Sequence, residues 1–168
     1  LAPLGLEQAE YLGVRFMALP IAAVYASPLQ RARQTAAAVA AHHNLEVQIE
    51  PDIIEIDAGD FEDRTFEEMR ELYPRELEIF DREPHLFTAP KGGESILDVY
   101  TRMVRGIGNI AQRHPNQSVV VVSHGCAIRS YLCFARAYPL EQMGGTEWGQ
   151  NTGVNHLIYY QGKVSLYQ

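Results

Sequence analysis

The sequence predicts an α/β fold with three layers, α/β/α, around a mostly parallel sheet that ends in an antiparallel hairpin. Helical and apolar strand segments alternate along the 168 residues, a pattern that gives parallel strands joined by helices. Four valines in a row at residues 119–122 are typical of a parallel strand covered on both faces. Near the C-terminus, Gln161 and Gly162 separate two strand-like runs, which predicts a hairpin turn.

The first half of the chain alternates helices with strands. The first helix carries apolar residues on one face, and Pro20 ends it. Ser27 and Pro28 suit the N-cap and the first position of the second helix. In chain order, the predicted elements are a helix over 4–19, a strand over 21–26, a helix over 28–43 and a strand over 47–50.

The second half begins with a carboxylate-rich loop and a charged helical region that breaks near Pro74. Ser95 caps a long helix with apolar residues at every third or fourth position. No repeat or linker interrupts the chain, so we expect a single domain over residues 1–168. The remaining predicted elements are the loop over 51–64, the helical region over 65–82, the long helix from 96, a strand over 119–122, a helix from 126 to about 135, and strands over 154–160 and 163–167.

Composition and charge limit the function classes. The net charge of −7 argues against nucleic acid or an anionic membrane surface as the main partner, although a local basic pocket can still bind an anionic substrate. No apolar run approaches the ~20 residues of a membrane-spanning helix. Cys126 and Cys133 lack the spacing of a zinc site or a disulfide scaffold. We therefore expect a protein of a reducing compartment, the cytoplasm.

Polar residues follow two of the predicted parallel strands at the edge where ligands of such sheets bind. Arg31 lies in the first turn of the helix after one strand, and a guanidinium there can hold two phosphate oxygens. His124 directly follows the four valines, and Gly125 allows a ligand to approach the backbone. Taken singly, Arg31 is more often a solvated charge and His124 a structural residue. Their coincidence at one edge predicts a phosphate site.

These segments resemble the histidine phosphatase superfamily, in its phosphoglycerate mutase branch. Each motif is modest alone, but five in the same order make the resemblance specific, and it covers nearly the whole chain. The segments are residues 4–9 (LGLEQA), 27–36 (SPLQRARQTA), 54–62 (IEIDAGDFE), 92–95 (GGES) and 123–125 (SHG).

The resemblance implies a mechanism without a metal or other cofactor. A nucleophilic histidine would attack phosphorus and form a phosphohistidine. Arg31 would be a phosphate-binding arginine, His124 would stabilise the transferring phosphoryl group, and Glu55 would protonate the leaving oxygen. Asp57 is the alternative donor, because at a spacing of two it would share a strand face with Glu55. The implied substrate is a small phosphomonoester, with residues 65–90 as a lid over its leaving group.

The sequence departs from the family at one point, because it contains no Arg-His-Gly motif. We expect the nucleophile on a strand that would precede Leu4. Three alternatives stay open: a mutase-type phosphoryl transfer, a phosphate-binding domain without catalysis, and a cysteine phosphatase that would use Cys126 at a helix N-terminus. The last lacks the Cys-x₅-Arg spacing, because the sixth residue after Cys126 is Leu132. A homodimer is also left open.

Overall fold

The computed structural model describes residues 1–167, which form two compact units. We name them the sheet unit and the acid-loop unit and describe each by itself. The single domain that we expect from the sequence stays a prediction. The sheet unit comprises Leu1–Ile54, Arg105–His124 and Gly149–Asn155, and the acid-loop unit comprises Glu55–Val104, Gly125–Trp148 and the chain from His156 onward.

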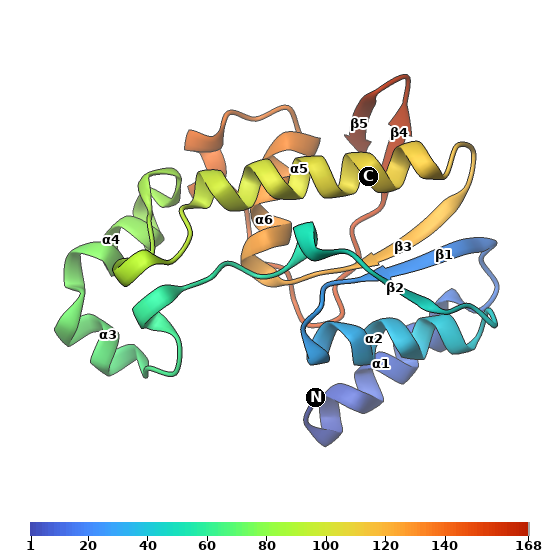
Figure 1. The fold of residues 1–168 in the computed structure, drawn as a ribbon, viewed down its shortest axis with the longest axis horizontal. Helices are drawn as coiled ribbons and strands as arrows, with labels where there is room; N and C mark the ends of the chain where they lie inside the picture. The colour runs from blue at the N-terminus through green and yellow to red at the C-terminus, as the bar shows by residue number, and fades with distance from the viewer. Residues whose placement is uncertain (168) are drawn as a thin grey trace. The chain divides into compact units, whose positions relative to one another are not determined.

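The sheet unit contains three parallel strands in the order β2-β1-β3 (Figure 1). β1 pairs with β2 on one side and with β3 on the other, both in parallel. This confirms the predicted parallel sheet and places β1 at its centre. The bounds are α1 Pro3–Phe16, β1 Ile21–Ala26, α2 Gln30–Ala41, β2 Val47–Ile49, a 3-10 turn at Pro51–Ile53 and β3 Ser118–Val122.

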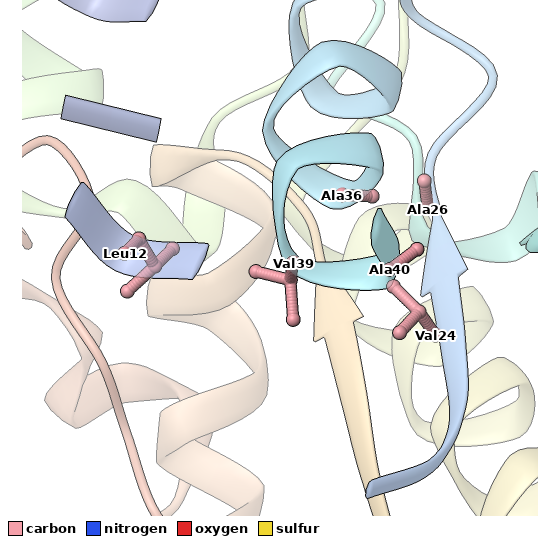
Figure 2. Packing of buried hydrophobic residues seen from close by; sticks show 6 residues of the cluster. All are labelled: Leu12, Val24, Ala26, Ala36, Val39 and Ala40. Atoms are coloured by element: carbon pink, nitrogen blue, oxygen red, sulfur yellow. The ribbon is translucent and has the colours of Figure 1, made fainter. Parts of the chain in front are cut away.

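Both faces of this sheet are covered, because successive side chains of a strand point to opposite faces. On one face, Val24 and Ala26 of β1 pack with buried residues of α1 and α2, among them Val39 (Figure 2). On the other face, Tyr25 packs with Ile110 of α5 (Ile96–Arg113). The four valines of β3 contribute alternately to the two clusters. The sheet unit is therefore the three-layer arrangement that the sequence predicts.

The acid-loop unit holds short helices and the hairpin. Thr65 caps α3 with a reciprocal capping box to Glu68, and Pro74 begins α4, so the predicted break is confirmed. Gln161 and Gly162 both have positive φ, as a two-residue turn of this kind requires. The bounds are α3 Phe66–Leu72, α4 Pro74–Arg82, α6 Gly125–Ala135, β4 Leu157–Tyr160 and β5 Lys163–Leu166, with 3-10 turns at Gly59–Phe61, Pro84–Leu86, Pro90–Gly92 and Leu140–Gly145.

The start of α2 differs from the prediction. The helix begins at Gln30 with Leu29 at its N-cap, and no side chain caps it. Ser27 is not the cap because it still belongs to the sheet edge, where its N–H donates to the carbonyl of Val122 at 3.0 Å. Its hydroxyl accepts only a 3.3 Å bond from the N–H of Leu29 on the helix side.

None of the helices in the described part of the chain is long and apolar enough to cross a membrane.

Candidate active site

Strand register brings the first group of candidate residues together. β1 and β3 run parallel with Ala26 opposite Val122, so the residues that follow each strand emerge at the same edge of the sheet. Ser27 follows β1, and His124 lies two residues after β3. Arg31 is the second residue of α2. The sequence-based expectation that Arg31 and His124 share one edge is therefore met inside the sheet unit.

His124 is held between two side chains. The Nε–H of Arg31 donates to His124 Nδ1 at 3.2 Å, and His124 Nε2 lies 2.7 Å from Ser27 Oγ. His124 and Ser27 are buried, whereas Arg31 is exposed. The guanidinium can only donate, so Nδ1 accepts and the imidazole proton lies on Nε2, from which it is donated to Ser27. The ring is thus fixed in orientation and tautomer, and the arginine remains accessible to an anion.

Glu55 belongs to the acid-loop unit, and its carboxylate lies at the N-terminus of α6. Its carboxylate accepts from the N–H groups of Cys126 at 3.2 Å and Ala127 at 2.9 Å. Free N–H groups and the helix dipole favour a negative charge at this position. The first-turn N–H groups of α6 therefore hold the Glu55 carboxylate.

Asp57, the alternative proton donor, is oriented differently. Residues 55–58 are not a strand, so the expectation that Asp57 shares a strand face with Glu55 is wrong. The Asp57 carboxylate turns back to accept from the N–H of Gly59 at 2.9 Å. Within the acid-loop unit, Glu55 has a helix terminus as its partner, whereas Asp57 closes a local turn.

Glu94 and Arg102 form an ion pair beneath the loop that carries Glu55. Arg102 donates from Nε and Nη2 to the two carboxylate oxygens of Glu94, each at 2.8 Å. Arg102 Nη2 also donates to the carbonyl of Glu55 at 3.1 Å, and Glu94 accepts from the N–H of Asp57 at 3.0 Å. Arg102 lowers the pKa of the Glu94 carboxyl, so this group is ionised at neutral pH. Ser95 is the helix cap that the sequence predicts, exchanging hydrogen bonds with Asp98.

Trp148 lies over Gly125, the first residue of α6. A Cβ atom added to Gly125 would lie 3.5 Å from the indole, which is 52% exposed. The guanidinium of Arg129 lies 4.6 Å from the same ring and donates to the carbonyls of Thr146 and Gly144. Gly125 is exposed, as a backbone contact with a ligand requires. Its role in substrate binding remains a prediction.

Cys126 has the opposite character from a catalytic thiol. It is buried, and desolvation, with Glu55 as a further cause, raises the pKa of the thiol to about 12. A cysteine nucleophile needs a pKa below its usual value. The position of Cys126 at a helix N-terminus does not lower the pKa of its thiol, and the cysteine phosphatase alternative loses its support.

Three side chains bind Asp60 in the acid loop, which we define as residues 55–64. Its carboxylate accepts from the hydroxyl of Tyr73, from Arg64 at 2.8 Å and from Lys91 at 3.0 Å. These partners lower the pKa of Asp60 to about 2, with the Tyr73 hydrogen bond as the largest cause. The cluster connects the start of α4 and the turn at Pro90–Gly92 to the acid loop.

The fold and the cluster around His124 define an α/β protein with basic side chains at the carboxyl edge of a parallel sheet. The family model of the histidine phosphatase superfamily (branch 1) matches residues 1–168. Phosphoserine phosphatase 1 of Hydrogenobacter thermophilus is 39% identical over 129 residues, 77% of this chain and 61% of that protein. Phosphoglycerate mutase-like protein 4 of Arabidopsis thaliana is 33% identical over 143 residues, 84% and 60% of the two chains. The chain belongs to the histidine phosphatase superfamily.

Solved structures share the fold. Bacillus stearothermophilus YhfR superposes with a TM-score of 0.93 at 29% identity, covering 99% of this chain and 82% of that one. The alpha-ribazole phosphatase of Shigella flexneri, at 23% identity, gives a TM-score of 0.84 with coverage of 99% and 82%. The chain spans about 60% of the length of the two curated relatives named above.

Two features of the site were missed in the sequence. The sequence led us to interpret Ser27 as a helix cap. Ser27 directly follows β1, and the register that places Ala26 opposite Val122 brings it near His124. No sequence pattern marked Arg102 as part of the site, because an arginine within a long amphipathic helix is usually solvated.

Proposed function

We propose that the full-length protein hydrolyses small phosphomonoesters through a phosphohistidine intermediate, with the nucleophilic histidine on a segment outside residues 1–168. The observation that carries the proposal is the cluster of Arg31, His124 and Ser27 at the carboxyl edge of β1 and β3. An exposed guanidinium beside a fixed imidazole is suited to binding phosphoryl oxygens and stabilising the charge of the transition state. Family membership supports the same reaction.

The reaction has two steps. In the first, a nitrogen of the nucleophilic histidine bonds to phosphorus, the bond to the leaving oxygen breaks, and Glu55 gives that oxygen a proton. In the second, Glu55 takes a proton from water as the water oxygen attacks phosphorus, and inorganic phosphate leaves the regenerated histidine. Arg31 and His124 bind the phosphoryl oxygens throughout. These roles follow the general needs of phosphoryl transfer, which are positioning and charge stabilisation.

The edge of β3 supports the placement of the missing nucleophile. Among the described residues, β3 pairs with β1 alone, and its four valines are only half-buried. Unpaired N–H and C=O groups on a valine-rich edge favour the addition of another strand. We place the nucleophile-bearing strand there.

Small phosphate esters are the substrate class that we propose. Relatives and structural neighbours are named as phosphatases of phosphoserine, glucosyl-3-phosphoglycerate and alpha-ribazole phosphate esters, all small molecules. We propose residues 65–90 as the lid over the leaving group and the cytoplasm as the compartment. The name of the Arabidopsis relative favours mutase-type transfer as the second candidate.

The test is to incubate the full-length protein, including any residues before position 1, with p-nitrophenyl phosphate and an excess of chelator. We expect inorganic phosphate release, and an acid-labile, base-stable phosphoenzyme after rapid quenching. Phosphate exchange between positions of phosphoglycerate without net release would favour the mutase. Phosphate binding with no turnover of any ester would overturn the proposal and favour a binding domain.

A further inference from the structure

The Glu94–Arg102 pair binds the backbone of the loop that carries Glu55. The guanidinium donates to the carbonyl of Glu55, and the carboxylate accepts from the N–H of Asp57. A backbone bond from the N–H of Glu94 to the carbonyl of Asp57, at 2.9 Å, adds a third connection. The pair therefore binds the main chain at Glu55 and at Asp57, on both sides of the intervening residue. The Glu55 carboxylate itself rests on α6.

Two glycines allow this close packing. A Cβ at Gly93 would lie 2.6 Å from the carbonyl oxygen of Asp57, and a Cβ at Gly59 would lie 2.1 Å from the carbonyl oxygen of Pro90. Gly59 also has a positive φ of 55°. Any side chain at these positions would push the Glu94 segment away from the acid loop. The contact is thus built into the backbone on both sides.

The pair has the geometry of a strong interaction. Two parallel N–H···O bonds between a guanidinium and a carboxylate fix both groups in one plane. The side chain of Arg102 is 11% exposed and that of Glu94 is 26% exposed, so solvent screens the pair only partly. A pair of this kind sets position well, because neither partner can rotate without breaking a bond.

We propose that Glu94 and Arg102 are positioning residues that hold Glu55 in place for proton transfer to the leaving oxygen. The proposal rests on the role given above to Glu55. The pair acts through the backbone from which the Glu55 side chain extends, and the N–H groups of Cys126 and Ala127 hold the carboxylate at the other end. Misplacing a catalytic group by about 1 Å can cost on the order of 10²-fold in rate.

The test compares two substrates that differ in their need for a proton. The p-nitrophenolate anion leaves phosphorus without protonation, whereas the alkoxide of an alkyl phosphate, such as phosphoserine, requires it. The measured quantity is the ratio of kcat/KM for the alkyl phosphate to that for p-nitrophenyl phosphate, on the full-length protein. The ratio reports formation of the phosphoenzyme and is independent of the concentration of folded enzyme.

We expect Glu55→Gln to lower this ratio by about 10²-fold or more, the contribution of a general acid. Arg102→Met and Glu94→Gln should lower it about 10-fold or more, and Arg102→Lys should lower it less, because lysine keeps the charge without the two parallel bonds. Glu94→Gln conserves side-chain volume, so the test remains available if Arg102→Met does not fold.

Arg105→Met is the matched control. Arg105 lies one turn further along α5 and makes the same two-bond pair with Asp52, at 2.8 and 2.7 Å. Both partners belong to the sheet unit, whereas Glu55 belongs to the acid-loop unit. Arg105→Met should leave the ratio within about 2-fold of the wild-type value, because we expect the loss of this pair to affect only the stability of the protein.

The outcomes separate the two proposals. If Glu55→Gln lowers the ratio but the Arg102 and Glu94 variants keep the wild-type value, the positioning role is wrong and the role of Glu55 stands. If Glu55→Gln also keeps the wild-type ratio, the proposed proton donor is wrong. If Arg105→Met lowers the ratio as much as Arg102→Met, any loss of an ion pair on α5 has this effect, and the positioning role is again wrong.

Discussion

The residues around His124 and the residues around Glu55 are placed by different kinds of interaction. His124, Ser27 and Arg31 meet because two parallel strands end at the same edge, and side chains alone complete their contacts. Each contact that places Glu55 involves a main-chain group on one side: its carboxylate accepts from two N–H groups of α6, and its carbonyl accepts from the Arg102 guanidinium. The first group depends on sheet register and the second on the path of a loop. Substitutions should therefore affect the two groups differently.

The largest effect is expected at the side-chain cluster. Arg31→Met and His124→Ala should each lower kcat for p-nitrophenyl phosphate by about 10²–10³-fold, the cost of removing a donor that stabilises transition-state charge. Arg33→Met is the matched control, because Arg33 is an exposed arginine on the same helix, and it should retain kcat within about 2-fold. Steady-state kinetics on the full-length protein measures kcat for these variants and for the control. Wild-type kcat in the Arg31 and His124 variants would remove this cluster from the site.

A smaller effect on kcat is expected for Ser27→Ala. The substitution removes the partner that fixes the ring of His124, and a hydrogen bond of this type contributes about 1 kcal/mol, or about 5-fold. Ser130→Ala sharpens the comparison, because Ser130 is equally buried but its hydroxyl donates to a backbone carbonyl, that of Ala127. We expect Ser27→Ala to lower kcat and Ser130→Ala to lower only the free energy of unfolding, measured with urea. Equal kcat values for both variants would count against the proposed orientation of His124.

The smallest effect is a pH dependence at Asp60. Its pKa is about 2 in the folded protein and near 3.9 in an unfolded chain, so folding favours the ionised form. The carboxylate therefore stabilises the fold fully above about pH 4, and this contribution disappears as the pH falls through 2. The free energy of unfolding of Asp60→Asn should be lower than that of the wild type at neutral pH and should approach it near pH 2.

Asp63→Asn is the control for Asp60, as an exposed carboxyl in the same loop, and its difference from the wild type should be small at every pH. Urea unfolding between pH 2 and pH 7 measures the curves. A difference for Asp60→Asn that stays constant over this range would show that its ion pairs do not stabilise the acid loop.

The sequence predicted most elements of the fold because their signals are local. β1 was predicted with its observed bounds, the break at Pro74 and the hairpin turn at Gln161 are confirmed, and the helix that Ser95 caps is present. The error at Ser27 has a definite cause. A serine before a proline has the local signature of a helix cap, and only the neighbouring strand shows that its N–H and hydroxyl are used at the sheet edge instead.

The sequence by itself determined the family, the parallel sheet and the two basic residues at its edge, because motif order, valine content and strand-to-helix transitions are written along the chain. Tertiary structure decided which groups those residues contact. It placed Ser27 on His124, turned Asp57 away into a local turn, and put the Glu55 carboxylate on the N–H groups of α6. The contacts of Ser27 and Glu55 join residues 97 and 72 positions apart, and their geometry depends on strand register and loop path. Neither of those leaves a local pattern in the sequence.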